Sequence, residues 1–355
     1  SKAGAAVAGR MPAWPKIRRG LVLGAVVLVA VYAFLLVTAG GRNLLDTVTL
    51  RPRLLALPLL ATILSYVTMS LSYEGITKAA GCFIRSRDML RITFVANTAN
   101  YIFPTGGLSG FALRMVMLTK KRIAGGKAVL ISFTQTLLTN LMLMAFIVYG
   151  LIHLIATRKM AVASMVAVAS IIGLLSIFLV LCLAMVYKKS LRTRFLAWAV
   201  RTTDRILHRF GHHERQSKRF HRLYRHVGEG MEFFADNPRA MVAPLFWIFL
   251  DWVFTIGILY AAFYSVGYPV AYSQVAVAFS VAIVAAVMSL VPGGVGVLEG
   301  SLALTFKSVG VPLEAALLPI FIFRMCFYVI PAILSLILAR GAFAELEEPV
   351  TEDML

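Results

Sequence analysis

The sequence has few acidic residues and few cysteines. Its 355 residues include 16 Asp and Glu against 35 Lys and Arg, so the formal net charge is +19 although only 14% of residues are charged. The three cysteines are isolated, which excludes a CxxC motif and a disulfide framework. Soluble domains carry about 25% charged residues. A chain that is 60% hydrophobic and basic is therefore predicted to be an integral membrane protein with basic surfaces.

Catalytic and cofactor motifs are also missing from the sequence. There is no GxSxG elbow, no Walker loop and no HExxH motif. Five of the six histidines fall between residues 208 and 226, but no cysteine or acidic cluster completes a ligand set, so solvated histidines are favoured over a metal site. We expect no enzyme activity, no cofactor and no metal.

Long uncharged runs predict membrane spans, because about 20 apolar residues cross the hydrocarbon core. The predicted full spans are 20–39, 54–73, 128–152 and 160–187, which carry no charge, and 241–264 and 315–339, which carry only Asp251 and Arg324 respectively. Two further apolar pieces, 92–118 and 274–308, are interrupted and are predicted to be re-entrant pairs of half-helices. For the second piece, an ordinary span over 274–291 is the open alternative.

The interruptions are two clusters of proline and glycine. The first runs from Pro104 to Gly110 and the second from Pro292 to Gly296. A broken helix at membrane depth survives only where protein or a water-filled cavity satisfies the freed amides. Broken helices at corresponding places in two halves of a chain point to a binding site near the bilayer midplane.

The distribution of basic residues orients the spans. With a cytoplasmic N-terminus, this topology places 27 of the 35 Lys and Arg residues inside and 6 outside, and leaves Arg114 and Arg324 at membrane depth. It also relates the two halves by inversion, and Pro104 precedes Gln135 by 31 residues as Pro292 precedes Arg324 by 32. The predicted fold is an all-α integral membrane protein with about six full spans and two re-entrant pairs in an inverted repeat.

This fold divides the chain into four regions. They are an N-terminal membrane half (1–187), a basic amphipathic cytoplasmic segment (188–240), a C-terminal membrane half (241–340) and a cytoplasmic tail (341–355). Apolar residues at helical spacing in 188–240, among them Leu191, Phe195 and Trp198, predict basic amphipathic helices that suit an anionic leaflet. Such stripes beside membrane spans argue against a nucleic-acid partner.

The breaks are predicted to bind an anion. A half-helix that begins after Gly110 would point free amides and its positive dipole end into the membrane, with Arg114 on its first turn. Arg324 in mid-span is costly in lipid, so a cavity-facing role is its default, and a structural ion pair with Asp251 is the alternative. The candidate substrate-binding residues are Asn97, Asn100, Pro104, Gly106, Gly107, Gly110, Arg114, Asp251, Pro292, Gly293, Gly294, Gly296, Glu299 and Arg324.

The residues around both breaks resemble a known family. The stretch NTANYIFPTGGLSGFALR at 97–114 resembles the first signature of the lysylphosphatidylglycerol synthase transmembrane region, a flippase-like superfamily. The stretch VPGGVGVLEG at 291–300, followed by Phe323-Arg324, is similar to its second signature. The resemblance implies a carrier that translocates lipids between leaflets of the bacterial cytoplasmic membrane, in the best-known members aminoacylated phosphatidylglycerol. This sequence departs from the family at two positions. Phe111 stands where the family usually has an acid, and Gln135 stands where it often has an arginine.

The function predicted from these features is a lipid transporter or flippase for an anionic or aminoacylated phospholipid, with both termini cytoplasmic. Because the sequence ends at Leu355 without an acyltransferase-like domain, synthase activity is not expected. The alternative is a non-transporting lipid-binding scaffold or regulator that uses the basic segment. A membrane-embedded transferase ranks third, because no acid–base pair can be assembled from the sequence. Homo-oligomerisation stays open.

Overall fold

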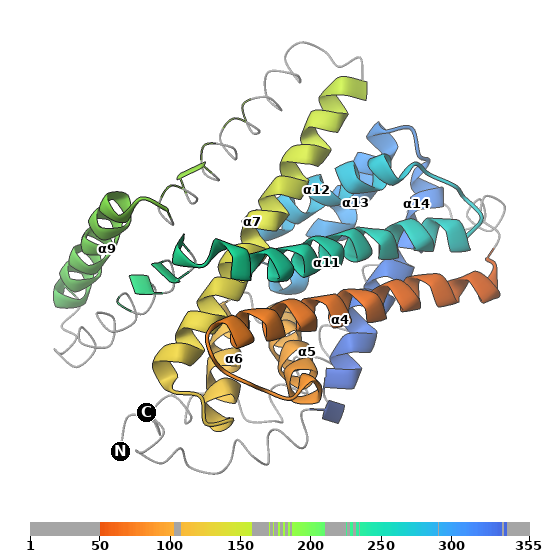
Figure 1. Cartoon of the computed structure of the whole chain (residues 1–355). Helices are drawn as coiled ribbons and strands as arrows, with labels where there is room; N and C mark the ends of the chain where they lie inside the picture. The colour runs from red at the N-terminus through yellow and green to blue at the C-terminus, as the bar shows by residue number, and fades with distance from the viewer. Residues whose placement is uncertain are drawn as a thin grey trace.

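The computed structural model describes residues 50–102, 108–157, 188–209, 237–289 and 291–335, together with scattered positions between 170 and 187 and between 225 and 236, and residues 337 and 338. Every regular element in these residues is helical (Figure 1). In chain order the helices are η1 (Pro52–Leu55), α4 (Ala56–Ala79), α5 (Ser86–Ile102), α6 (Leu108–Lys120), α7 (Gly125–Thr157), α9 (Lys189–Arg209), α11 (Pro238–Ser265), α12 (Tyr272–Ser289), η2 (Pro292–Gly294), α13 (Val297–Ser308), α14 (Leu313–Arg324) and the π-helical turn η3 (Met325–Val329).

Helices α4 and α11 lie side by side and antiparallel along their length (Figure 1). At one end the Arg51 N–H donates to the Ser265 carbonyl over 2.9 Å. Near the other end, a Cβ atom added to Gly75 would lie 3.1 Å from Cγ of Pro244. Small residues at helix interfaces in membranes let the two backbones approach closely. The pair therefore forms a tight seam.

The same order of elements occurs on both sides of this seam. Helix α4 leads into α5 and α6, which pack on each other, and then into α7. Helix α11 leads into α12 and α13, which also pack on each other, and then into α14. Because α4 and α11 are antiparallel and each is followed closely by its helical hairpin, the two hairpins start at opposite ends of the seam. Helix α5 also contacts η2, so the first hairpin reaches the second break.

In the part of the chain that the structure describes, four helices are long and apolar enough to cross a membrane: Pro52–Ala79, Gly125–Gly150, Pro238–Ser265 and Leu313–Ser335. They confirm the spans predicted at 54–73, 128–152, 241–264 and 315–339. The predicted span 20–39 lies outside the described residues, and 160–187 is described only at scattered positions.

The helices of the two hairpins are shorter. Helices α6 and α13 have 13 and 12 residues, or about 20 and 18 Å at 1.5 Å per residue, against a hydrocarbon core of about 30 Å. The first hairpin begins at Ser86, earlier than the predicted 92. Asp88 lies in the first turn of α5, where a negative charge stabilises the start of a helix. Helix α12 occupies most of 274–291, and α13 folds back against it.

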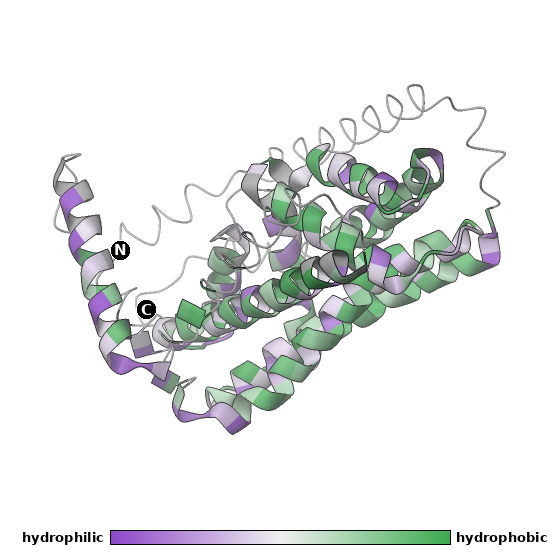
Figure 2. Ribbon diagram, turned by 90° about the horizontal axis from the view of Figure 1, so that it is seen from above, coloured by the Kyte–Doolittle hydropathy of each residue, from purple (hydrophilic) through white to green (hydrophobic). Residues whose placement is uncertain are grey.

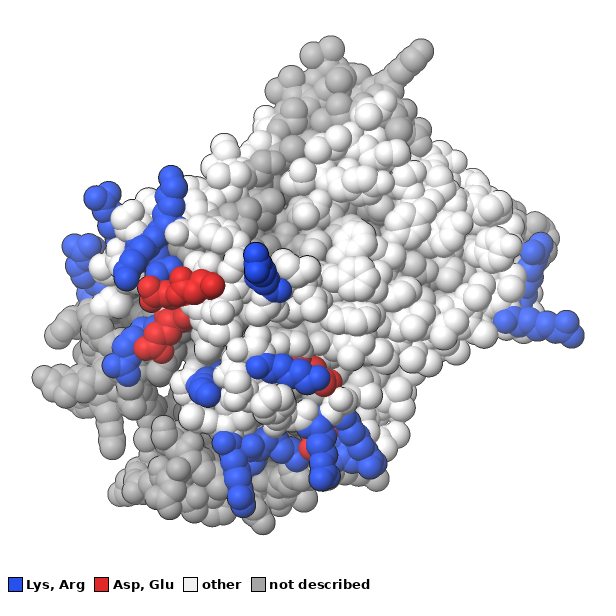
Figure 3. Space-filling model, viewed as in Figure 1, with Lys and Arg blue, Asp and Glu red and all other residues white. Residues whose placement is uncertain are grey.

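The surface separates an apolar band from basic ends. Figure 3 shows basic side chains gathered where α9 and the loops near α5 and α6 lie, and a broad region without charged side chains over α4 and α11. Exposed Arg51 and Arg53 lie at the opposite end, where α4 begins. In Figure 2 the paired long helices are mainly hydrophobic, whereas α9 alternates between polar and apolar residues and crosses their end. This distribution is typical of a protein embedded in a bilayer.

Candidate functional site at the two helix breaks

The second break turns the chain sharply between α12 and α13. Gly293, Gly294 and Gly296 have φ values of 60°, 60° and 83°, a left-handed conformation that costs glycine little. A Cβ atom added to Gly294 would also lie 2.9 Å from Cβ of Ala286 on α12. The glycine cluster is therefore required by the turn and by close packing within the hairpin.

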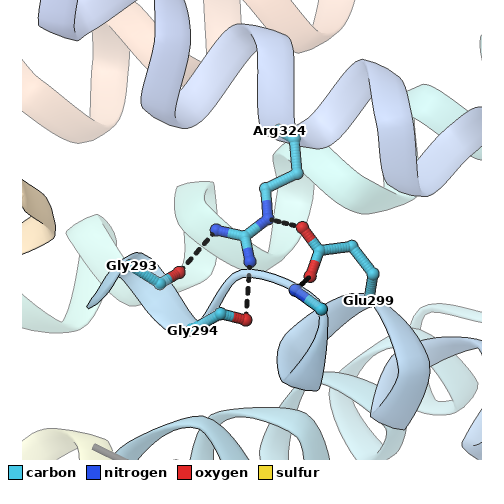
Figure 4. A network of polar contacts seen from close by, with 5 residues as sticks. Gly293, Gly294, Glu299 and Arg324 are labelled. Atoms are coloured by element: carbon cyan, nitrogen blue, oxygen red, sulfur yellow. Dashed lines mark hydrogen bonds and ion pairs between the residues drawn. The ribbon is translucent and has the colours of Figure 1, made fainter. Parts of the chain in front are cut away.

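Arg324 holds this turn from the end of α14. Its Nη1 donates to the Gly293 carbonyl over 2.9 Å and its Nη2 to the Gly294 carbonyl over 3.2 Å (Figure 4). Its Nε lies 2.6 Å from Oε1 of Glu299, and its guanidinium lies 4.3 Å from the ring centroid of Tyr328. The side chains of Arg324 and Glu299 are only 2% and 1% exposed. A planar guanidinium suits this site because its donors point in several fixed directions.

Glu299 has a second task at the start of α13. Its Oε2 accepts the Gly296 N–H over 2.8 Å, so the carboxylate caps the helix from its third position. One carboxylate thus satisfies a backbone amide freed by the break and neutralises the buried arginine. We call the set Gly293, Gly294, Gly296, Glu299 and Arg324 the Arg324 clamp.

The clamp corrects one alternative drawn from the sequence. The sequence leaves open a structural ion pair between Asp251 and Arg324, but in the structure the carboxylate that pairs with Arg324 is that of Glu299. Asp251 accepts a hydrogen bond from Ser65 instead. Both acids were candidate site residues. Which of them meets Arg324 depends on how α11, α13 and α14 pack, and the sequence carries no signal for that choice.

The first break is only partly within the described residues. Pro104, Gly106 and Gly107 lie outside them, and the side chain of Pro292 at the second break is likewise not described. Gly110, at the start of α6, donates its N–H to Oδ1 of Asn100 on α5 over 2.7 Å. A Cβ atom on Gly110 would clash with the Asn100 amide and would lie 2.6 Å from the Ala96 carbonyl. The first hairpin is therefore closed by a neutral amide, whereas a charged clamp closes the second.

The Gly110 amide is thus not available to an anion in this structure, in contrast to the sequence prediction. Arg114, one turn further along α6, lies with its guanidinium 5.7 Å from the ring centroid of Tyr73 on α4. Buried Gln135 on α7 accepts a hydrogen bond from Ser72 over 3.1 Å, and buried Asn97 lies on α5. The first half therefore offers a cation, an aromatic ring and amide groups near its break.

A third polar group lies on the seam between α4 and α11. Ser65 donates to Oδ1 of Asp251 over 2.5 Å, and its hydroxyl is 3.1 Å from that of Thr255. Tyr66, next to Ser65, stacks on Phe94 of α5 with a centroid distance of 4.2 Å. Asp251 is only 5% exposed. The sequence did not single out Ser65, Tyr66 or Thr255, because serine, threonine and tyrosine are common in apolar helices.

Comparison with known proteins identifies the family. The family model described as the lysylphosphatidylglycerol synthase TM region matches residues 21–335. The phosphatidylglycerol lysyltransferase of Staphylococcus haemolyticus (strain JCSC1435) is 32% identical over 93 residues, and that of Staphylococcus aureus (strain MRSA252) is 31% identical over 94 residues. Each alignment covers 26% of this chain but only 11% of the relative. Because the family model covers most of the sequence, the chain belongs to the family of the lysylphosphatidylglycerol synthase TM region.

Proposed function

We propose that this protein is a lipid carrier that moves a phospholipid with an anionic or aminoacylated headgroup between the leaflets of the bacterial cytoplasmic membrane. One observation carries the proposal: two broken helical hairpins start at opposite ends of one antiparallel helix pair, and α5 of the first reaches the break of the second. Paired broken helices around a central site are the recurring architecture of secondary transporters. Membership of a family whose relatives are named for phosphatidylglycerol supports a phospholipid as the substrate.

The topology that goes with this proposal is an inverted repeat. The basic end with α9 faces the cytoplasm, and the end with Arg51 and Arg53 faces outward. The first hairpin then enters from the cytoplasm and the second from outside, and neither crosses the membrane. Two openings that face opposite sides would give a lipid headgroup access from each leaflet in turn.

The two breaks have different tasks in this proposal. The guanidinium of Arg324 already binds two carbonyls and a carboxylate, so it holds the second hairpin together. Arg114, which is on the first hairpin, lies beside the Tyr73 ring of α4 and is less deeply buried than Arg324. We assign the headgroup phosphate to Arg114, with Asn97 of α5 as a candidate second residue from the same hairpin. The second break then acts as the rigid partner of a site on the first.

Lipid exchange in liposomes tests this assignment. The purified chain is reconstituted with fluorescent phosphatidylglycerol, and the label accessible to a membrane-impermeant quencher is followed over time. Arg114→Ala should slow exchange by about tenfold or more, since a hydrogen bond to a charged group contributes about 1.5–3 kcal/mol. Arg87→Ala, which removes an exposed arginine near the start of α5, is the control and should exchange at the wild-type rate. A wild-type rate in folded Arg114→Ala would contradict the assignment.

The second candidate function is a lipid-binding scaffold or regulator, and α9 is the observation that favours it. Leu191, Phe195 and Trp198 are spaced along one face of α9 and are 37%, 42% and 58% exposed. Arg192, to one side of this face, has its Nη2 3.2 Å from Oε1 of Glu232. An exposed apolar face with flanking basic residues suits the surface of an anionic leaflet. Deletion of residues 190–235 separates the two functions, because a carrier keeps basal lipid exchange and a scaffold loses its activity.

A further inference from the structure

Asp251 is a buried acid that the clamp does not use. It lies near the midpoint of α11 and faces α4, where the Ser65 hydroxyl donates to it over 2.5 Å. Its exposed fraction is 5%, and Thr255 lies one turn further along the same helix. A carboxylate at this depth in a membrane protein is a functional-site candidate by default.

The charges around Asp251 do not neutralise it. Among the described residues, no Lys, Arg or His forms an ion pair with it, and the buried cation of α14, Arg324, is paired with Glu299. The Tyr66 hydroxyl on α4 interacts electrostatically with Asp251, and its own other neighbours are the Asn97 amide of α5 and the Tyr328 hydroxyl of η3. Within the described part of the chain the Tyr66 hydroxyl has no well-aligned hydrogen-bond partner. The groups placed at Asp251 are therefore the hydroxyls of Ser65 and Tyr66, both of them neutral.

A lone carboxylate in such surroundings has a high free-energy cost of desolvation unless it is paired or loses its charge. Within the described residues Asp251 belongs to no group of three His, Cys, Asp or Glu, and a proton neutralises a carboxylate without any set of ligands. Hydroxyl groups can serve both charge states, because each can donate to a carboxylate or accept from a carboxylic acid. Ser65 donates to the charged form of Asp251. When Asp251 gains a proton, the Ser65 hydroxyl can instead accept from it and donate to the Thr255 hydroxyl.

The position of Asp251 links this proton to movement. Helices α4 and α11 are the first long helices of the two halves, and alternating access requires the halves to move against each other. A change of charge on the seam between them alters how tightly the seam packs. Resting on the proposed carrier function, we propose that Asp251 is a proton-coupling site, which binds a proton from one side of the membrane and releases it to the other during lipid exchange.

The test uses the full chain in liposomes with fluorescent phosphatidylglycerol and an imposed pH gradient. For the wild type, the gradient should shift the distribution of labelled lipid between leaflets at least twofold. Asp251→Asn should keep exchange in the absence of a gradient but lose the shift. Asp236→Asn, which removes an exposed acid and makes the same change in charge, should keep both.

The outcomes separate the two proposals. A full gradient response in Asp251→Asn would overturn the coupling site, as would wild-type exchange that ignores the gradient. If folded Asp251→Asn lost exchange even without a gradient, Asp251 would hold lipid or structure and the coupling site would also be overturned. If the wild type exchanged no lipid at all, the carrier function itself would fail. Asp251→Glu, which keeps an acid, should retain the response and guards against a folding defect in the asparagine variant.

Discussion

The Arg324 clamp predicts a large and measurable coupling between two buried side chains. Removing Glu299 alone, as in Glu299→Leu, leaves Arg324 buried without its counter-charge, which costs about 3–5 kcal/mol. It also removes the cap on the Gly296 amide, a further loss of about 1 kcal/mol. Arg324→Met leaves Glu299 unpaired at a similar cost and takes the donors from two carbonyls, at about 1–3 kcal/mol each.

The double variant Glu299→Leu/Arg324→Met contains no lone charge. Its loss of stability should therefore fall short of the sum of the single losses by about 3 kcal/mol or more, because neighbours that share an interaction are not additive. Unfolding of the purified wild type and the three variants in mixed detergent micelles, followed by circular dichroism, measures the four free energies of unfolding that the comparison needs. The control cycle uses Arg225 and Glu229, an exposed pair with 3.8 Å between Nε and Oε1, for which coupling of about 0.5 kcal/mol or less is expected.

Additive losses at Glu299 and Arg324 would refute the clamp, since they would mean that each side chain is satisfied without the other. Coupling as small as that of the surface pair would lead to the same conclusion. A large coupling with wild-type lipid exchange in the double variant would keep the clamp but remove its proposed role in holding the second hairpin for transport.

Three further predictions concern individual positions. Gly110→Ala should destabilise the protein by about 1–3 kcal/mol through the clash with Asn100. Gly125→Ala should not, because the space around its Cβ is open. Equal unfolding midpoints for the two variants would argue against the close approach of α5 and α6. Arg324→Lys should lose most of the stability lost in Arg324→Met, because one ammonium group cannot reach both carbonyls and the carboxylate, and wild-type stability would exclude this geometry. A fluorescent dye on Trp198→Cys should shift its emission to the blue in nanodiscs of phosphatidylglycerol relative to phosphatidylcholine; identical spectra would place this face of α9 away from the bilayer.

The sequence alone located the membrane helices and the breaks. Runs of about 20 apolar residues predict spans wherever they occur, and proline and glycine interrupt a helix through their own backbone, so both features are local. This is why the spans that correspond to α4, α7, α11 and α14 could be predicted from residue numbers. The same reasoning identified Arg324 as a costly residue at membrane depth, with Asp251 and Glu299 among the candidate site residues.

Only the tertiary structure decided which of these residues meet. Ser65 and Asp251 are 186 positions apart, and Arg324 reaches Gly293 across 31 positions, distances over which helical periodicity carries no information. The antiparallel packing of α4 on α11 brings a hydroxyl to Asp251, and the fold of α13 against α12 and α14 brings Glu299 to Arg324. Burial then decided the outcome, because in a low-dielectric interior a charged group must find a partner or become neutral, which for a carboxylate means gaining a proton, and the packing determines which of the two is possible.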